Sequence, residues 1–85
     1  MTLTQARSLK KAMEKEFDGT AEFEPVNGAG RYRFAITSKK FAKVPHLKRQ
    51  DKAWKVVDRV LPREATVDVS MILTFAPAEL EAVGK

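Results

Sequence analysis

The apolar residues near the start of the chain recur every three or four positions. This spacing runs from Ala6 to Phe17, and it is typical of a helix that buries one face. Thr2, with Gln5 three positions later, matches the capping box that begins many helices. The pattern therefore predicts a first helix from about Leu3 to Phe17.

The pattern then changes to an alternation of apolar and polar residues, which is typical of a strand with one buried face. Ala21 and Phe23 form one such run, and residues 32–36 form another, with a glycine-rich turn at residues 27–30 between them. We expect an antiparallel hairpin. Pro25 has no backbone N–H to offer a neighbouring strand, so the first strand should lie at the edge of the sheet or end there.

Helical spacing returns from Leu47 to Leu61, and it is followed by Pro62, a residue that helix interiors do not tolerate. A second, amphipathic helix is therefore predicted. The side chains expected on its core side are Leu47, Trp54, Val57, Val60 and Leu61.

A second alternating run predicts a third strand. The residues expected on its core side are Val67, Val69, Met71, Leu73 and Phe75. A strand, a crossover helix and another strand normally give a parallel, right-handed pair, so this strand should lie beside the second one. Pro77 and Glu79 suit the first turn of a short last helix. The predicted order is αββαβα, and the predicted fold class is α+β: a two-layer sandwich with a three-stranded mixed sheet and the helices mainly on one face.

Length and composition limit what the chain can build. With 85 residues, of which 44% are hydrophobic, it can form one core, so we expect a single domain over residues 1–85. It contains no cysteine, which excludes disulfides and thiolate metal sites. No apolar segment at the N-terminus resembles a signal peptide or a membrane span. We therefore expect a cytoplasmic protein that does not associate with membranes.

The positive charge is concentrated in the middle of the chain. Residues 31–63 hold eleven Lys or Arg and only two acidic residues, within a total net charge of +5. Asymmetry of this size indicates an anionic partner. Four of these cations fall on one stripe of the predicted second helix, although any amphipathic helix also needs a solvated face. The residues expected to bind nucleic acid, mainly through its phosphates, are Lys39, Lys40, Lys43, Lys48, Arg49, Lys52, Lys55 and Arg59.

The chain offers little for catalysis. It has one histidine, His46, and no cysteine, so the usual pairs of nucleophile and base are not available. His46 is expected to be partly exposed rather than a ligand. Asp68 and Glu79 are expected to be solvated surface carboxylates rather than an acid pair. We predict no enzyme and no metal site.

The aromatic residues and the glycine-rich turn have competing interpretations. Trp54 and Tyr32 are expected to pack in the core, although an exposed Trp54 would stack on a base. The sequence leaves the burial of Phe41 open. The turn glycines can form an anion-binding nest, but a plain turn is favoured because no helix begins after it.

Several segments, taken together and in order, resemble the BolA family, whose fold is like that of the type II KH domain. They are residues 32–38 leading to Phe41, residues 47–49 with Trp54, residues 67–74 and residues 77–80. The resemblance implies a DNA-binding role, which is attributed to some BolA proteins, and with it transcription regulation and a stress response. The connector from Ser38 to Leu47 contains no glycine, so it lacks the Gly-x-x-Gly clamp of nucleic-acid-binding KH domains. The missing clamp makes binding of single-stranded RNA less expected, and DNA is favoured over RNA, although the sequence does not separate the two.

The resemblance also implies an alternative function, because some BolA proteins share a [2Fe-2S] cluster with a monothiol glutaredoxin. In those proteins a His early in the third strand is a cluster ligand, and a second His or Cys comes from the hairpin loop. Here Asp68 stands at the strand position and the loop has neither residue, so we predict no cofactor. The alternative is an adaptor that docks a glutaredoxin or another iron–sulfur trafficking partner. Its interface would include Asp68, Asn27, Gly28 and Gly30.

Overall fold

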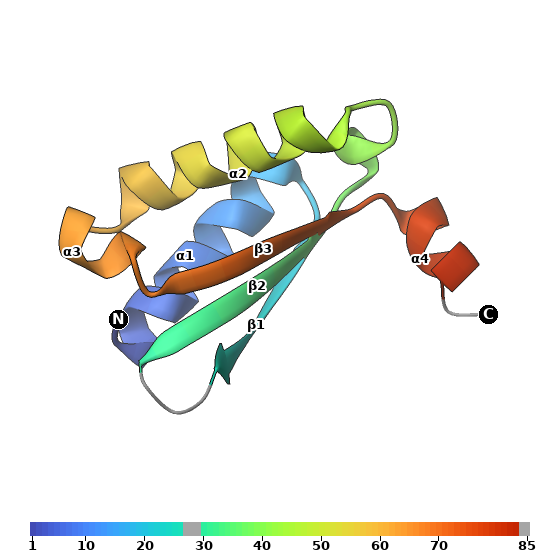
Figure 1. Ribbon diagram of the computed structural model, residues 1–85. Coiled ribbons are helices and arrows are strands. Elements are labelled where there is room, and N and C mark those ends of the chain that lie inside the picture. The colour runs from blue at the N-terminus through green and yellow to red at the C-terminus, as the bar shows by residue number, and fades with distance from the viewer. Residues whose placement is uncertain (27–29, 84–85) are drawn as a thin grey trace.

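The computed structural model describes residues 1–26 and 30–83, with side chains as far as Leu80. Figure 1 shows a three-stranded sheet with two long helices on one of its faces. In chain order the elements are α1 (Leu3–Phe17), β1 (Thr20–Val26), β2 (Arg31–Thr37), the 3-10 helix η1 (Lys39–Phe41), α2 (His46–Val60), α3 (Arg63–Thr66), β3 (Val69–Phe75) and α4 (Pro77–Val83). The two short helices η1 and α3 are additional to the predicted elements.

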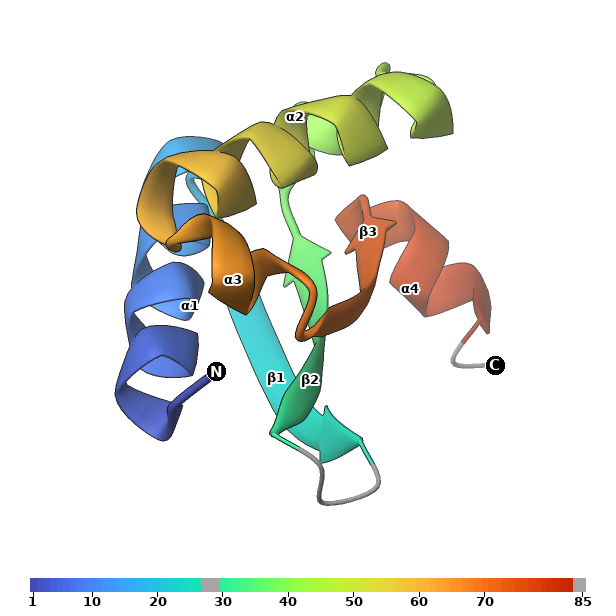
Figure 2. The same ribbon diagram turned by 60° about the vertical axis from the view of Figure 1, so that its left-hand side comes forward.

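The sheet has the predicted topology. β1 pairs with β2 in antiparallel orientation, β2 pairs with β3 in parallel orientation, and β2 is the central strand. α1 and α2 cover the same face, whereas α4 lies beyond the end of β3, away from α1 (Figure 2). The α+β class, the mixed sheet and the edge position of the strand with Pro25 are therefore confirmed. Within residues 1–26 and 30–83, none of the helices has both the length and the apolar character that crossing a membrane requires.

α1 forms as the sequence predicts. The Thr2 hydroxyl accepts a hydrogen bond from the N–H of Gln5, and the Gln5 side chain accepts one from the N–H of Thr2, so the capping box is present. The residues that α1 buries are Ala6, Leu9, Met13 and Phe17. They pack in one core cluster with Phe34 and Ile36 of β2.

α2 is turned about its axis relative to the prediction. The side chains that it buries are Arg49, Ala53, Val56 and Val57. Trp54 is only partly buried against the core, and Leu47 is 86% exposed, so the predicted core position of Leu47 is wrong. The apolar residues of this helix form two overlapping stripes, and their spacing does not say which stripe meets the core. The stripe with the small, fully buried Ala53 lets α2 approach α1 and the sheet closely.

β3 departs from the predicted alternation because of an irregularity in its pairing with β2. Tyr32 is opposite Val69, but the next residue of β2 is opposite Met71, so β3 carries one extra residue. One extra residue reverses the face to which every later side chain points. The residues buried after it are Ile72 and Thr74, and those exposed are Met71 and Leu73. The predicted core positions of Met71 and Leu73 are therefore wrong, as is that of Val67, which ends α3 and is 68% exposed.

The free edge of β3 is protected by side chains of α2. The carbonyl of Ile72 accepts a hydrogen bond from Gln50 Nε2 at 2.7 Å. The carbonyl of Thr74 accepts one from Arg49 Nη1 at 3.3 Å. Unpaired carbonyls on an edge strand invite pairing with another chain, so these contacts disfavour association through β3.

The other edge, β1, is protected in a similar way. The N–H of Ala21 donates to the Glu14 carboxylate at 3.1 Å. This bond to its charged form lowers the pKa of Glu14. Pro25, further along the same strand, has no N–H to offer. Both edges of the sheet are thus poor templates for further strands.

Ser38 holds the connector between the sheet and α2 in place. Its hydroxyl donates to the carbonyl of Phe17 at the end of α1 and accepts from the N–H of Lys40 at 3.1 Å. Its own N–H donates to the carbonyl of Phe75 at 2.9 Å. Phe41, whose burial the sequence left open, is buried and lies 5.0 Å from Phe17 between ring centres. The end of α1, the connector and the end of the sheet are therefore fixed relative to one another.

Candidate nucleic-acid interface

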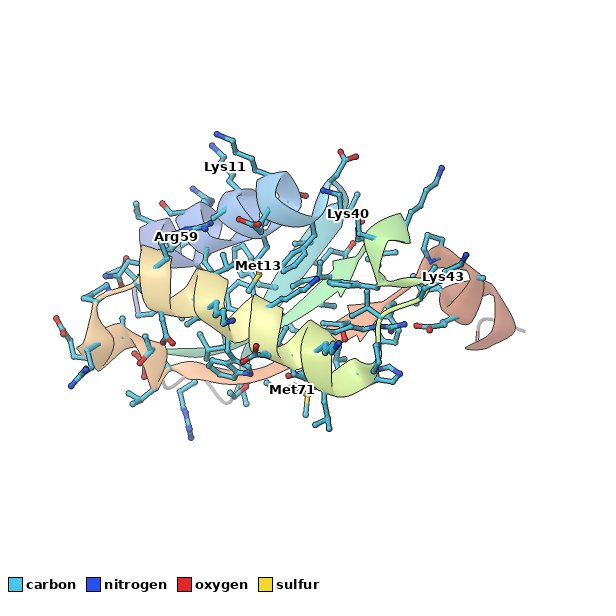
Figure 3. All side chains as sticks on the ribbon, turned by 90° about the horizontal axis from the view of Figure 1, so that it is seen from above. Lys11, Met13, Lys40, Lys43, Arg59 and Met71 are labelled. Atoms are coloured by element: carbon cyan, nitrogen blue, oxygen red, sulfur yellow. The ribbon has the colours of Figure 1, made fainter. Side chains whose placement is uncertain are left out.

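A groove of about 380 Å³ lies between α2, η1 and the last turn of α1. Its polar lining consists of Lys40, Lys52, Lys55, Arg59 and Glu16, and its apolar lining consists of Phe17, Phe41, Val44 and Val56. Figure 3 shows Lys40 and Arg59 toward opposite ends of the space between α1 and α2. The fold thus gathers four cations from two separate segments above an apolar floor.

α2 carries three of these cations beside its buried face rather than directly opposite it. Lys52, Lys55 and Arg59 follow one another at helical spacing on a single stripe. Because α2 is turned so that Ala53 and Val56 meet the core, this stripe faces η1 and the end of α1. The cations therefore line a groove, where a stripe opposite the core would have formed a ridge.

η1 supplies the fourth cation. Lys40 is the middle residue of this short helix, whose first turn is capped by the Ser38 hydroxyl. Its neighbour Phe41 is buried against Phe17, so the backbone that carries Lys40 is anchored on both sides. The sequence placed Lys40 in a basic connector without fixing its position, and the anchoring makes it a fixed part of the groove.

Two of the four cations have a carboxylate partner. Arg59 Nη1 is 3.1 Å from Glu16 Oε1, and Lys55 Nζ is 3.3 Å from Asp51 Oδ2. All of these side chains are largely exposed, and such surface pairs contribute only about 0–1 kcal/mol. An incoming phosphate can displace them at little cost. Within the described parts of the chain, Lys40 and Lys52 form no salt bridge.

The remaining predicted lysines lie outside the groove. Lys39, Lys43 and Lys48 are all exposed, and Figure 3 shows Lys43 at the end of the molecule near α4. They extend the positive surface along the connector and the first turn of α2. Of the eight predicted residues, four therefore line the groove, three flank it, and Arg49 does neither.

Arg49 does not belong to this surface, and its predicted contact with nucleic acid is wrong because its side chain is 4% exposed. Nε donates to the carbonyl of Val44 at 2.7 Å, and Nη2 donates to that of Phe41 at 2.6 Å. The guanidinium carbon is 5.6 Å from the centre of the Phe41 ring. Arg49 thus fixes two of the residues that line the groove. The one signal for this in the sequence is its position four residues before Ala53, on the side of α2 that meets the core.

Asp68, the centre of the alternative interface, is already engaged within the chain. Its carboxylate accepts a hydrogen bond from the α-amino group of Met1, which also donates to the carbonyl of Gly30 at 3.1 Å. Gly30 itself is exposed. Asn27 and Gly28, the other residues predicted for this interface, lie outside the described residues.

The [2Fe-2S] cluster implied by the BolA resemblance does not fit the residues present. Such clusters are held by thiolates or imidazoles, and the chain has no cysteine and one histidine. His46 begins α2, beside the end of β3 where Arg49 bonds Thr74, whereas Asp68 precedes the start of β3. In the part of the chain that the structure describes, no three His, Cys, Asp or Glu side chains are grouped so that they could hold a metal ion.

No family model matches the sequence, and no curated protein matches it significantly. Solved structures do match. BolA1 from Arabidopsis thaliana has a TM-score of 0.69 at 18% identity, covering 88% of this chain and 94% of that one. The BolA domain of SufE1 from Arabidopsis thaliana has a TM-score of 0.67 at 21% identity, covering 93% and 98%. A bol-like protein from Babesia bovis has a TM-score of 0.68 at 12% identity, covering 99% and 98%. The chain therefore has the BolA-like fold that the resemblance implied.

Proposed function

We propose that this protein is a non-enzymatic BolA-like protein that binds nucleic acid, DNA in preference to RNA, through the groove and the exposed cations around it. The observation that carries the proposal is the convergence of Lys40 from η1 with the α2 cations, against one lining carboxylate, Glu16. Cations placed in this way attract a polyanion and release its counterions on binding.

The expected contacts are mainly to phosphates, because Lys and Arg are the polar groups that line the groove together with Glu16. Phosphate contacts carry no direct sequence information. Binding should therefore weaken steeply with salt and depend little on sequence. The cytoplasmic location and the role in transcription regulation and stress response, which we expected from the sequence and the BolA resemblance, belong to the same proposal.

The test compares two triple variants that lose the same charge. Lys40→Gln, Lys52→Gln and Lys55→Gln together remove groove cations. Arg7→Gln, Lys11→Gln and Lys15→Gln together remove three exposed cations of α1, and Figure 3 shows Lys11 pointing away from α2. The affinity of each triple variant for a labelled 12-nucleotide DNA is measured by fluorescence anisotropy over a series of salt concentrations.

The groove variant should bind DNA at least about tenfold more weakly at low salt. The slope of log K against log salt concentration should become shallower by about 0.7 to 0.9 for each phosphate contact removed. The α1 variant should lose less affinity for DNA, since it changes only the long-range electrostatic field of the protein. Equal losses for the two variants would show that net charge alone is responsible and would remove the groove from the proposal.

A second candidate function is the adaptor that docks a monothiol glutaredoxin or another iron–sulfur trafficking partner. It is supported by large apolar side chains exposed on either side of Asp68, with Val67 68% and Met71 47% exposed, because exposed apolar groups often mark protein contacts. The BolA fold also occurs as a domain of SufE1. Co-expression with a monothiol glutaredoxin, followed by size-exclusion chromatography and a visible absorption spectrum, tests it. A colourless mixture that elutes as separate proteins counts against this function.

A further inference from the structure

We infer that the groove selects single-stranded nucleic acid over duplex. This inference rests on the proposed function and names the form of the ligand. The connector, which lacks the Gly-x-x-Gly clamp of KH domains, supplies Lys40, Phe41 and Val44 to the groove, so a strand bound there would be held by these side chains instead. Three features carry it: the concave setting of the cations, the apolar floor between them, and the short length of the cation row.

The cations line a hollow between two walls. Lys52, Lys55 and Arg59 form one wall on α2, and Lys40 with Glu16 lies across from them on η1 and α1. The view in Figure 3 looks down onto this space, with Arg59 and Lys40 at its ends. A helix that reads a duplex enters the major groove, which is about 12 Å wide, with its contact side fully exposed. The α2 cations are exposed, Lys55 by 74% and Arg59 by 61%, but they line a hollow whose other side is formed by η1 and the end of α1. A wide, rigid duplex therefore meets the rim of this hollow before its floor.

The floor of the groove suits a base that has left its stack. Val44, Phe41 and Phe17 lie between the cations, and a volume of about 380 Å³ is within the range of small-ligand pockets, about 300–1,000 Å³. A single strand presents phosphates and unstacked bases together, whereas a duplex keeps its bases inside. Only the single strand can therefore use the cations and the floor at the same time.

The length of the cation row limits how much strand is held. From Lys52 to Arg59 the helix rises about 10 Å, at 1.5 Å per residue. Both phenylalanines are nearly buried, so a base would touch ring edges and the side chain of Val44. We therefore expect contact with a few nucleotides and weak preference among the bases.

The experiment compares one 12-nucleotide DNA strand of mixed sequence with the duplex that it forms with its complement, at the same salt concentration. Partial packing of one base corresponds to the low end of the stacking contribution, about fivefold in affinity, so the single strand should bind at least about fivefold more tightly. Val44→Trp fills the groove without changing the charge, and the carbonyl of Val44 that Arg49 binds is kept. It should weaken binding of the single strand by about fivefold and weaken duplex binding less.

Methyl NMR of the native protein provides a second readout that does not depend on the folding of the variant. The signals of Val44 and Val56 should shift on addition of the single strand and stay in place with the duplex. Equal or tighter binding of the duplex overturns the inference and leaves the proposed function standing. Failure of both DNA forms to bind overturns the inference and the proposed function together.

Discussion

The guanidinium of Arg49 and the carboxylate of Glu79 form two parallel hydrogen bonds, Nη1 to Oε1 at 2.8 Å and Nη2 to Oε2 at 2.9 Å. Glu79 also accepts from the N–H of Ala76 at 2.9 Å. Through the same guanidinium, α2 is connected to the carbonyls of Val44, Phe41 and Thr74. One side chain therefore joins α4, the end of β3 and the groove floor, which makes Arg49 a positioning residue for the candidate site.

Replacing Arg49 by lysine should destabilise the fold. A single ammonium group cannot bridge both carboxylate oxygens and reach three carbonyls, and buried acceptors left without donors are costly. We expect Arg49→Lys to lower the free energy of unfolding by about 2–3 kcal/mol, measured by urea denaturation.

The matched control for this substitution is Arg59→Lys on the same helix. Arg59 is exposed and has one surface partner, Glu16, so its free energy of unfolding should change by less than about 0.5 kcal/mol. Similar losses for the two variants would contradict the role assigned to Arg49.

Stability should depend on pH through Glu79. The Arg49 guanidinium, and after it the N–H of Ala76, lower the pKa of Glu79 from 4.5 to about 2. Because the folded value is the lower one, the stabilising contribution is fully present above pH 4.5 and is lost as the pH falls toward 2. Unfolding midpoints measured at several pH values from 2 to 6 should therefore rise with pH in this window. Glu79→Gln should make that rise shallower, and an unchanged rise would contradict the assignment.

Gly19 should not tolerate a side chain. A Cβ added there would overlap the carbonyl oxygen of Thr37, a backbone atom that cannot move aside cheaply. We expect Gly19→Ala to cost about 2 kcal/mol or more, measured by thermal unfolding. Gly30→Ala is the comparison. A Cβ added at Gly30 has room, and only the φ of +74° at this residue opposes a side chain. This substitution should therefore lower the free energy of unfolding by only about 1 kcal/mol. A larger cost at Gly30 than at Gly19 would contradict this explanation.

Removing the hydroxyl group of Thr74 should stabilise the fold. Its Oγ1 is buried and has no hydrogen-bond partner among the described residues, and burying such a group costs free energy. Thr74→Val should raise the free energy of unfolding by about 1 kcal/mol, as measured by urea denaturation. Thr66→Val should have the opposite sign, because the Thr66 hydroxyl donates to the carbonyl of Arg63 at 2.7 Å. A Thr74→Val variant that is less stable than the native protein would show that the hydroxyl has a partner.

The elements that the sequence predicted correctly are those in which local signals agree. For α1 the capping box of Thr2 and Gln5 and the apolar spacing that ends at Phe17 indicate the same helix, and both signals are local. The strand order follows from connection lengths and handedness, which also depend little on distant contacts. The errors lie where a tertiary contact chose between two local possibilities: one extra residue reversed Met71 and Leu73 in β3, and the packing of Ala53 turned α2 away from Leu47.

Residue order alone was enough to predict the α+β class and the basic middle section, because periodicity and charge can be read along the chain. It did not determine which cations act together. The packing of distant segments placed Lys40 across from Lys52 and Arg59, and it buried the side chain of Arg49, which pairs with the partly exposed Glu79. The physical reason is that the rotation of a helix and the pairing of distant side chains are decided by packing against the rest of the core, and residue spacing within one segment carries no information about that packing.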